Sequence, residues 1–166
     1  MKFKYLLFFS LLVASLQAAS VVDLTFTLNG DGTEYSVSDC LGTASGSLDI
    51  PSTYNGLPVT SIGDNAFNNC SSLTSVTIPN SVTSIGEDAF GFNQLASVMI
   101  PNSVVRLSGF ANNQLTSVTI PDSVMSIGQS AFRQNQLASL TIPDGVTSIG
   151  DGAFSGNQIT SVTIPD

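Results

Sequence analysis

From Pro51 onward the chain repeats one short phrase five times, and this repeat constrains the fold more than any other feature of the sequence. Every unit begins with proline and ends with isoleucine; three units are 22 residues long, one is 28 and one is 20. The units run Pro51–Ile78, Pro79–Ile100, Pro101–Ile120, Pro121–Ile142 and Pro143–Ile164. A unit of this size cannot bury its own apolar side, so the repeat predicts a solenoid in which successive coils stack.

One coil can be followed in Pro79–Ile100, which reads PNSVTSIGEDAFGFNQLASVMI. Its end, Leu-x-Ser-Val-x-Ile, alternates apolar and polar residues, so it predicts a short strand that lies parallel to the same strand of the next coil. The proline that follows lacks an N–H and ends the strand. Val-Thr-Ser-Ile-Gly predicts a shorter extended segment on the other side, and Asp-x-Ala-Phe a single helical turn. The expected fold is a β-rich solenoid.

The interior of the stack is predicted from positions that recur in every complete coil. A phenylalanine recurs in the helical-turn segment, so Phe90, Phe132 and Phe154 are expected in one column. A polar or small residue follows three positions later, where a tight buried turn needs partners for its backbone groups. These residues are expected to form a structural ladder: Cys70, Asn93, Asn113, Asn135 and Asn157.

The two cysteines, Cys40 and Cys70, permit more than one interpretation. Cys70 fits the ladder as a small, buried and unreactive turn residue, and on this interpretation both cysteines are dispensable for folding. A disulfide is chemically permitted in an exported chain, but spacing alone does not show whether the two side chains meet. The sequence leaves the bond open.

The complete pattern, Ile-Pro-x-x-Val-x-x-Ile-Gly-x-x-Ala-Phe-x-x-Asn/Cys-x-Leu-x-x-Val-x-Ile-Pro, resembles the BspA-like class of bacterial leucine-rich repeats. Its opening variant, from Ile50 to Pro79, is similar to the way such arrays begin, and the resemblance covers about Asp39 to Asp166. It implies a leucine-rich-repeat solenoid that is secreted or displayed at the cell surface. It also implies a role in adhesion or in binding host proteins.

Three segments are predicted along the chain. Residues 1–20 have two lysines, an apolar stretch and small residues, which predicts a signal peptide; a retained membrane anchor is the alternative. Residues 21–49 predict a hairpin cap around the turn 29–32, with a calcium-binding loop as the less favoured interpretation of the same turn. Residues 50–166 form the repeats, and their last coil is expected to be uncapped, which would permit end-to-end association or mark a piece of a longer array.

Charge and composition exclude several functions. Without the first twenty residues, the chain has twelve acidic residues and two basic ones, Arg106 and Arg133, which gives a side-chain net charge of −10. Nucleic acid and anionic membrane surfaces are therefore unsuitable partners. The chain has no histidine, no nucleophile motif and no metal-ligand spacing, so neither an enzyme, a metal nor a cofactor is expected.

The function that remains is binding of a protein or glycan by the outward strand residues. Phe92 and Met99 are expected as anchors, because other coils carry amides or hydroxyls at those positions. The candidate binding residues are Ser75, Thr77, Phe92, Ser97, Met99, Ser117, Thr119, Ser139, Thr141, Ser161 and Thr163. The alternatives are an ice or crystal binder that uses the Ser/Thr array and a structural fragment of a larger surface protein.

Overall fold

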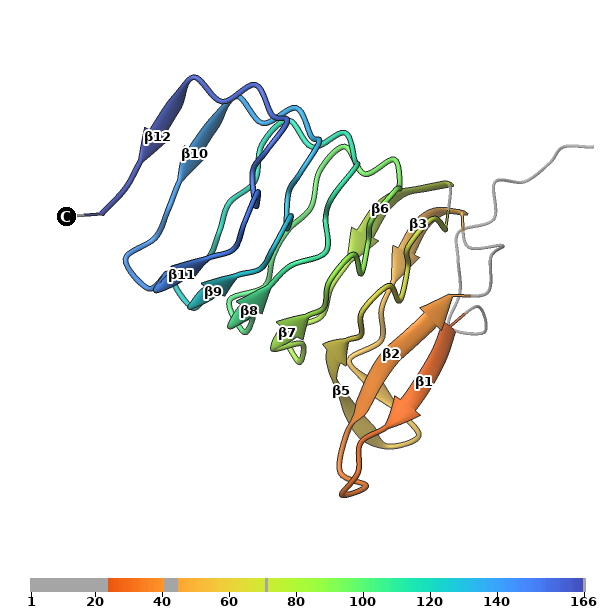
Figure 1. The fold of residues 1–166 in the computed structure, drawn as a ribbon. Coiled ribbons are helices and arrows are strands. Elements are labelled where there is room, and N and C mark those ends of the chain that lie inside the picture. Colours follow the sequence, from red (N-terminus) through yellow and green to blue (C-terminus); the bar gives the residue numbers. More distant parts are fainter. Residues whose placement is uncertain (1–23, 41–44, 71, 166) are drawn as a thin grey trace, which may run out of the picture.

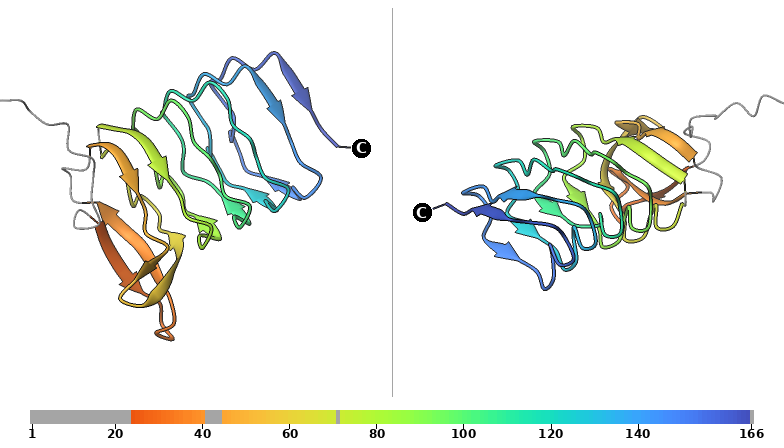
Figure 2. Two further views of the ribbon diagram at one scale, coloured as in Figure 1. Left: turned by 180° about the vertical axis from the view of Figure 1, so that it is seen from behind. Right: turned by 90° about the horizontal axis from the view of Figure 1, so that it is seen from above.

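The computed structural model describes residues 24–40, 45–70 and 72–165, which form a stack of coils made of strands and turns (Figure 1). Viewed from behind and from above, the coils follow one another in chain order from the N-terminal hairpin to the last coil (Figure 2). The β-rich solenoid with stacked parallel strands is therefore confirmed. The predicted signal peptide, residues 1–20, lies outside the described residues.

One side of the coils carries a continuous sheet of eight strands. From β5 onward, facing residues lie in register, so Ser61 is opposite Ser84 and Ile62 is opposite Ile85. Ile62, Ile85, Leu107 and Ile127 point into the core, as the Val-Thr-Ser-Ile alternation predicts, whereas Ile149 in the last coil is 49% exposed. The strands are, in sheet order, β1 (Leu24–Leu28), β2 (Tyr35–Cys40), β5 (Leu57–Ile62), β7 (Ser84–Ile85), β8 (Arg106–Leu107), β9 (Ser126–Ile127) and β11 (Ser148–Ile149), with β4 (Thr53–Tyr54) beside β5.

A second side, here called the strand face, consists of residues 72–77, 96–100, 116–120, 139–141 and 161–163. It forms only two pairs of parallel strands. These are β3 (Ser45–Asp49) with β6 (Ser72–Thr77), and β10 (Ser139–Thr141) with β12 (Ser161–Thr163). In the two middle coils, the stretches 96–100 and 116–120 form no strand, and their backbone groups make no hydrogen bond to any described residue.

The expectation of a strand ladder through every coil of this face is therefore wrong. The alternation behind it is present, since Met99 is exposed and Ile100 is buried. The bonds between these coils are instead made earlier in the chain, where the Gln114 N–H donates to the Leu95 carbonyl at 3.0 Å. Alternation determines which side chains face inward, whereas a ladder also needs neighbouring backbones about 4.8 Å apart.

The expected helical turns are also wrong, because the described residues contain no helix. In the second unit the Ala89 N–H donates to the Gly86 carbonyl at 3.4 Å, and the Gly91 N–H to the Asp88 carbonyl at 2.9 Å. Asp88 has a left-handed backbone, with a φ of 47°. One left-handed residue ends a right-handed helix, so this part of the coil makes consecutive tight turns.

The core contains a column of stacked phenylalanines. Phe67, Phe90, Phe110 and Phe132 are fully buried, and Phe154 is half-buried in the last coil. Successive ring centroids are 5.0, 5.1, 5.6 and 5.6 Å apart, and the rings are nearly parallel. The three phenylalanines that the sequence placed in one column thus lie in it, with Phe67 and Phe110 as further members. This column keeps the coils in register.

At the N-terminal end, β1 and β2 form an antiparallel hairpin around residues 29–32. Asn29 Oδ1 accepts hydrogen bonds from the N–H groups of Thr33 and Glu34, at 2.9 and 3.1 Å. The hydroxyl and the N–H of Thr33 both donate to the Asp31 carboxylate. These two bonds, the hydroxyl bond foremost, lower the pKa of Asp31. The Oδ1 atoms of Asn29 and Asp31, which a calcium loop would use, are engaged within the turn, which favours the turn interpretation.

Residues 35–40 and 45–50 belong to an incomplete coil that the repeat pattern does not reveal. Its β2 pairs with β5 in the continuous sheet, and its β3 pairs with β6 on the strand face. Val37, Leu48 and Ile50 are buried at positions that complete coils fill with valine and isoleucine. Much of the segment expected as a cap is therefore built like the repeats. It lacks the Ala-Phe turn from which a repeat can be recognised in sequence.

Candidate ligand-binding face

A ladder of asparagines holds the turns that lead into the strand face. Asn113 Nδ2 donates to the Phe90 carbonyl of the preceding coil at 2.9 Å and to the Phe110 carbonyl of its own coil at 3.3 Å. Its Oδ1 accepts from the Leu95 N–H at 3.0 Å. Asn135 repeats these contacts one coil further and Asn157 in the last coil. These are the bonds that the ladder interpretation requires.

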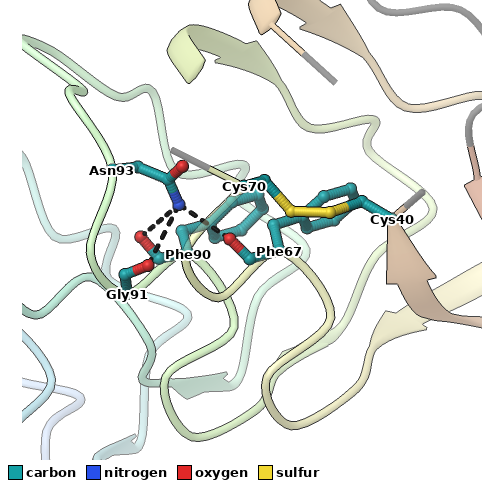
Figure 3. The surroundings of a disulfide bond; sticks show 6 residues. All are labelled: Cys40, Phe67, Cys70, Phe90, Gly91 and Asn93. Atoms are coloured by element: carbon teal, nitrogen blue, oxygen red, sulfur yellow. Dashed lines mark hydrogen bonds between the residues drawn. A yellow bond between two sulfur atoms is a disulfide. The ribbon is translucent and has the colours of Figure 1, made fainter. Parts of the chain in front are cut away.

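The ladder begins with a disulfide. Cys40 and Cys70 are bonded, with Cα atoms 6.9 Å apart, and Figure 3 shows the bond beside Phe67 and Asn93. Asn93 Nδ2 donates to the carbonyls of Phe67 and Phe90 at 2.7 and 3.0 Å. Cys70 thus occupies an asparagine position, and its bond ties the incomplete coil to the first complete one. The interpretation of Cys70 as merely a small turn residue is therefore incomplete. The repeat pattern does not reveal the coil that carries Cys40, so the sequence alone does not place the two cysteines side by side.

The candidate binding residues lie on the outer surface of the coils. Met99 is 83% exposed and Phe92 is 53% exposed, whereas Ser75 is half-buried. The remaining candidates are exposed: Thr77, Ser97, Ser117, Thr119, Ser139, Thr141, Ser161 and Thr163. Their binding role stays a prediction.

Two grooves lie between coils on the strand face, where the ladder is interrupted. The larger has a volume of about 450 Å³ and is lined by Asn80, Val98, Met99, Ile100, Asn102, Thr119 and Pro121. The smaller, of about 330 Å³, is lined by Val118, Thr119, Ile120, Asp122, Thr141 and Pro143. Thr119 borders both. The unpaired backbone groups of 96–100 and 116–120 must be hydrated or bound by a ligand, because a buried unpaired amide is costly.

From the first complete coil onward, the strand face and the turns leading to it carry no charged residue; the incomplete coil carries the exposed Asp49 in β3, beside β6. No Asp, Glu, Lys or Arg occurs in 68–78, 92–100, 111–120, 134–142 or 156–164. The acidic residues of the complete coils lie in the turns that follow the two extended segments, and of these Asp122 borders one of the two grooves. Amides, hydroxyls and one exposed methionine therefore make up the surface offered to a ligand.

The structure does not bring the two expected anchors into one groove. Met99 lines the larger groove, whereas Phe92 lies in the preceding turn, directly before the buried Asn93. Asn80 and Asn102 line the groove but were not among the candidates. Both directly follow the proline of their unit, so the repeated Pro-Asn pair was the signal that could have identified them.

No metal-ion site is evident in the described part of the chain. Residues 24–40, 45–70 and 72–165 contain no group of three Asp, Glu or Cys side chains that could hold a metal ion. The same residues include no helix long and apolar enough to cross a membrane.

Comparison with known proteins identifies relatives of this architecture. Residues 46–109 and 105–166 match the family described as the BspA type leucine rich repeat region, in six copies. The T. pallidum leucine rich repeat protein TpLRR is 28% identical, with a TM-score of 0.78 over 88% of this chain and 71% of its own. A leucine-rich repeat protein from Bacteroides ovatus is 32% identical, with a TM-score of 0.74 over 86% of this chain and 40% of its own.

The pneumococcal vaccine antigen PcpA has the same fold, with a TM-score of 0.65 at 17% identity over 91% of this chain and 50% of its own. No protein of curated function matches the chain significantly. The family match spans all of the residues from Gly46 to Asp166, and the stacked coils, phenylalanine column and asparagine ladder recur through them. This chain belongs to the BspA-type leucine-rich repeat family.

Proposed function

We propose that this protein is an exported binding module that recognises a neutral protein or glycan at the cell surface through its strand face. The observation that carries the proposal is the absence of charged residues from that face in the complete coils, in a chain with a net charge of −8. A surface without charges has no charged groups to pair with those of a ligand, so specificity must come from hydrogen bonds and shape.

The two grooves supply both kinds of contact. Unpaired N–H and C=O groups along 96–100 and 116–120 can donate to and accept from a ligand, and Asn80 and Asn102 add planar amides at the larger groove. Met99 adds a flexible apolar side chain that packs against irregular surfaces. A ligand that displaces water from the grooves satisfies the backbone groups that the interrupted ladder leaves free.

Export is supported by two independent features. The first twenty residues have the pattern of a signal peptide. The Cys40–Cys70 disulfide belongs to the kind of bond that forms and persists in oxidising compartments. Secretion or display at the cell surface would place the strand face where an extracellular partner can reach it.

The other hypotheses are less favoured. An ice or crystal binder needs an unbroken hydroxyl array, and the strand face is interrupted at 96–100 and 116–120. Catalysis would have to depend on scattered carboxylates in turns, so a non-enzymatic scaffold is the better proposal. End-to-end association stays a prediction; it would use the exposed Val162 and Ile164 of the last coil.

A consensus variant tests the strand face. Met99→Thr restores the residue that Thr77, Thr119 and Thr141 provide in other coils, so it should preserve folding. Met125→Thr is the matched control: Met125 is also exposed, and directly before β9 its N–H donates to the Val105 carbonyl, directly before β8, at 2.9 Å. Wild type and both variants are applied to a neutral-glycan array and to an array of extracellular proteins.

We expect Met99→Thr to weaken the strongest interaction by about tenfold, the equivalent of removing one good apolar contact. Met125→Thr should bind like wild type. Equal binding by all three proteins would place the site outside the larger groove, and loss of binding with Met125→Thr alone would place it on the continuous sheet.

A further inference from the structure

Phe92 occupies a backbone position that disfavours its side chain. It belongs to a column of left-handed residues that precede the ladder positions of successive coils, and Phe92 has a φ of 56°. The other members are Asn69, Asn112, Gln134 and Gly156. Asparagine and glycine adopt this conformation readily, whereas a bulky residue does so at a cost. Phe92 is the aromatic member of this column.

The backbone around Phe92 is held on both sides. Its N–H donates to the Ala111 carbonyl of the next coil at 3.1 Å, and the Asn69 N–H of the preceding coil donates to the Gly91 carbonyl at 2.9 Å. The following residue, Asn93, is anchored in the buried ladder. The turn therefore cannot relax to relieve the strain, and the ring is presented from a rigid support.

The core does not explain the strain. Phe92 is 53% exposed, so much of its ring faces solvent, and the core column is already filled by Phe90 and its neighbours. A strained and exposed aromatic residue, at a position where asparagine would fit better, indicates a contact role.

We propose that Phe92 is a stacking platform for one sugar ring of a neutral saccharide. The left-handed column places Asn69 in the preceding coil and Asn112 in the following one. In the core of these coils, the ring of Phe90 lies 5.0 Å from that of Phe67 and 5.1 Å from that of Phe110. The residues at the same column position in the two adjacent coils are thus both asparagines. Their hydrogen-bonding groups suit the hydroxyls at the edge of a sugar whose apolar face covers the ring.

The surroundings favour a saccharide over a protein. A protein interface needs an apolar cluster at its centre, and the residues beside Phe92 in the column are amides. A single ring instead matches the apolar face of one sugar. The Asp88 side chain lies against Gly91, directly before Phe92, so an anionic sugar would be repelled. This site lies outside the strand-face grooves and does not depend on ligand binding there.

Tryptophan substitution provides a direct test, because the chain contains no tryptophan. In Phe92→Trp the emission reports this position alone. Gln134→Trp, in the same column two coils later, is the matched control. The probes are cellohexaose, laminarihexaose, mannohexaose and galactohexaose, with polygalacturonate as the anionic probe and serum albumin as the protein probe.

We expect at least one neutral oligosaccharide to shift the Phe92→Trp emission to the blue and to protect it from acrylamide, with no change in Gln134→Trp. Saturation-transfer NMR should show the same saccharide bound to wild type, and Phe92→Asn should weaken binding about tenfold or more. Because Phe92→Asn relieves the backbone strain, its Tm should rise by ~2–4 °C.

Each other result overturns the proposal. These are no response to any neutral saccharide, an equal response in Gln134→Trp, a response to albumin or polygalacturonate alone, or unchanged saccharide binding by Phe92→Asn. The strand face is tested separately: Met99→Thr should leave the Phe92 saccharide response intact, so failure of one site is distinguishable from failure of the other.

Discussion

Removal of one ladder asparagine tests the internal architecture quantitatively. Asn135 is 5% exposed, and its Nδ2 donates to the carbonyls of Phe110, Phe132 and Arg133 at 2.9, 3.1 and 3.3 Å. Its Oδ1 accepts from the Leu115 N–H at 3.0 Å. Asn135→Ala removes all four bonds.

The cost depends on which groups keep a partner. The Phe110 carbonyl still receives Asn113 Nδ2 and the Phe132 carbonyl still receives Asn157 Nδ2. Only the buried Leu115 N–H loses its sole partner. One buried orphan donor costs about 1–3 kcal/mol, and each further lost bond about 0.5–1.5 kcal/mol. Because the three carbonyls keep another donor, their losses lie at the low end of that range, and we expect Asn135→Ala to lower the free energy of unfolding by about 2.5–4.5 kcal/mol.

Asn157→Ala is the matched control, since Asn157 makes equivalent bonds but is half-buried in the last coil. Water can replace part of its contacts, so we expect a loss of about 1–2 kcal/mol. Both losses are to be measured by denaturant melts, and they report stability if the variants keep the m-value of wild type. A loss below about 1 kcal/mol for Asn135→Ala, or equal losses for the two variants, would refute the ladder as a source of stability.

Three further perturbations act on other parts of the fold. Phe132→Ala should cost about 3–5 kcal/mol, because the ring is fully buried and stacks at 5.6 Å on both neighbours; a denaturant melt that shows under 1 kcal/mol would contradict the column. Reduction of the Cys40–Cys70 disulfide, checked by mass spectrometry, should lower stability by about 3–4 kcal/mol, because the bond closes a loop of 30 residues; unchanged stability would show that the bond is dispensable. Gly109→Ala should lower the Tm strongly, because Gly109 has a φ of 93° and a Cβ there would lie 2.5 Å from the Gly86 carbonyl, whereas Gly30→Ala meets no atom within 4 Å and should be nearly neutral.

The repeated positions of the coil could be predicted well from sequence. Phe90 and Phe132 recur at one place in the phrase, and the polar residue three positions later recurs with them. Stacking makes such positions contact their equivalents, because each coil must bury its apolar side against the next. A periodic sequence therefore specifies which residues form columns.

Pairing between coils was less predictable. The alternation at Val98, Met99 and Ile100 gives the correct inward and outward sides, yet no ladder forms there. The hydrogen bonds between these coils are made instead by the backbone N–H groups of the glutamines that precede this face, such as Gln114. The continuous sheet lies on the other side, along the Thr-Ser-Ile segments. Local alternation contains no measure of the distance between neighbouring coils, which decides where hydrogen bonds form.

The disulfide and the large groove escaped prediction for a related reason. Cys40 belongs to a coil without the Ala-Phe turn, so its position beside Cys70 emerged only from the pairing of β2 and β5. Asn80 and Asn102 look like ordinary turn residues in sequence. They become groove residues because no backbone hydrogen bonds among the described residues close the middle coils on the strand face.

Hydrogen exchange measured residue by residue tests the open strand face most directly. The amides of 97–100 and 117–120 should exchange rapidly in the free protein, since they make no hydrogen bond to described residues, while Leu107 and Ile127 in the continuous sheet should exchange slowly. Addition of the ligand captured in the array should slow the first group. Slow exchange of 97–100 and 117–120 in the free protein, equal to that of Leu107 and Ile127, would show that the coils pair across the strand face and that the proposed binding grooves are closed.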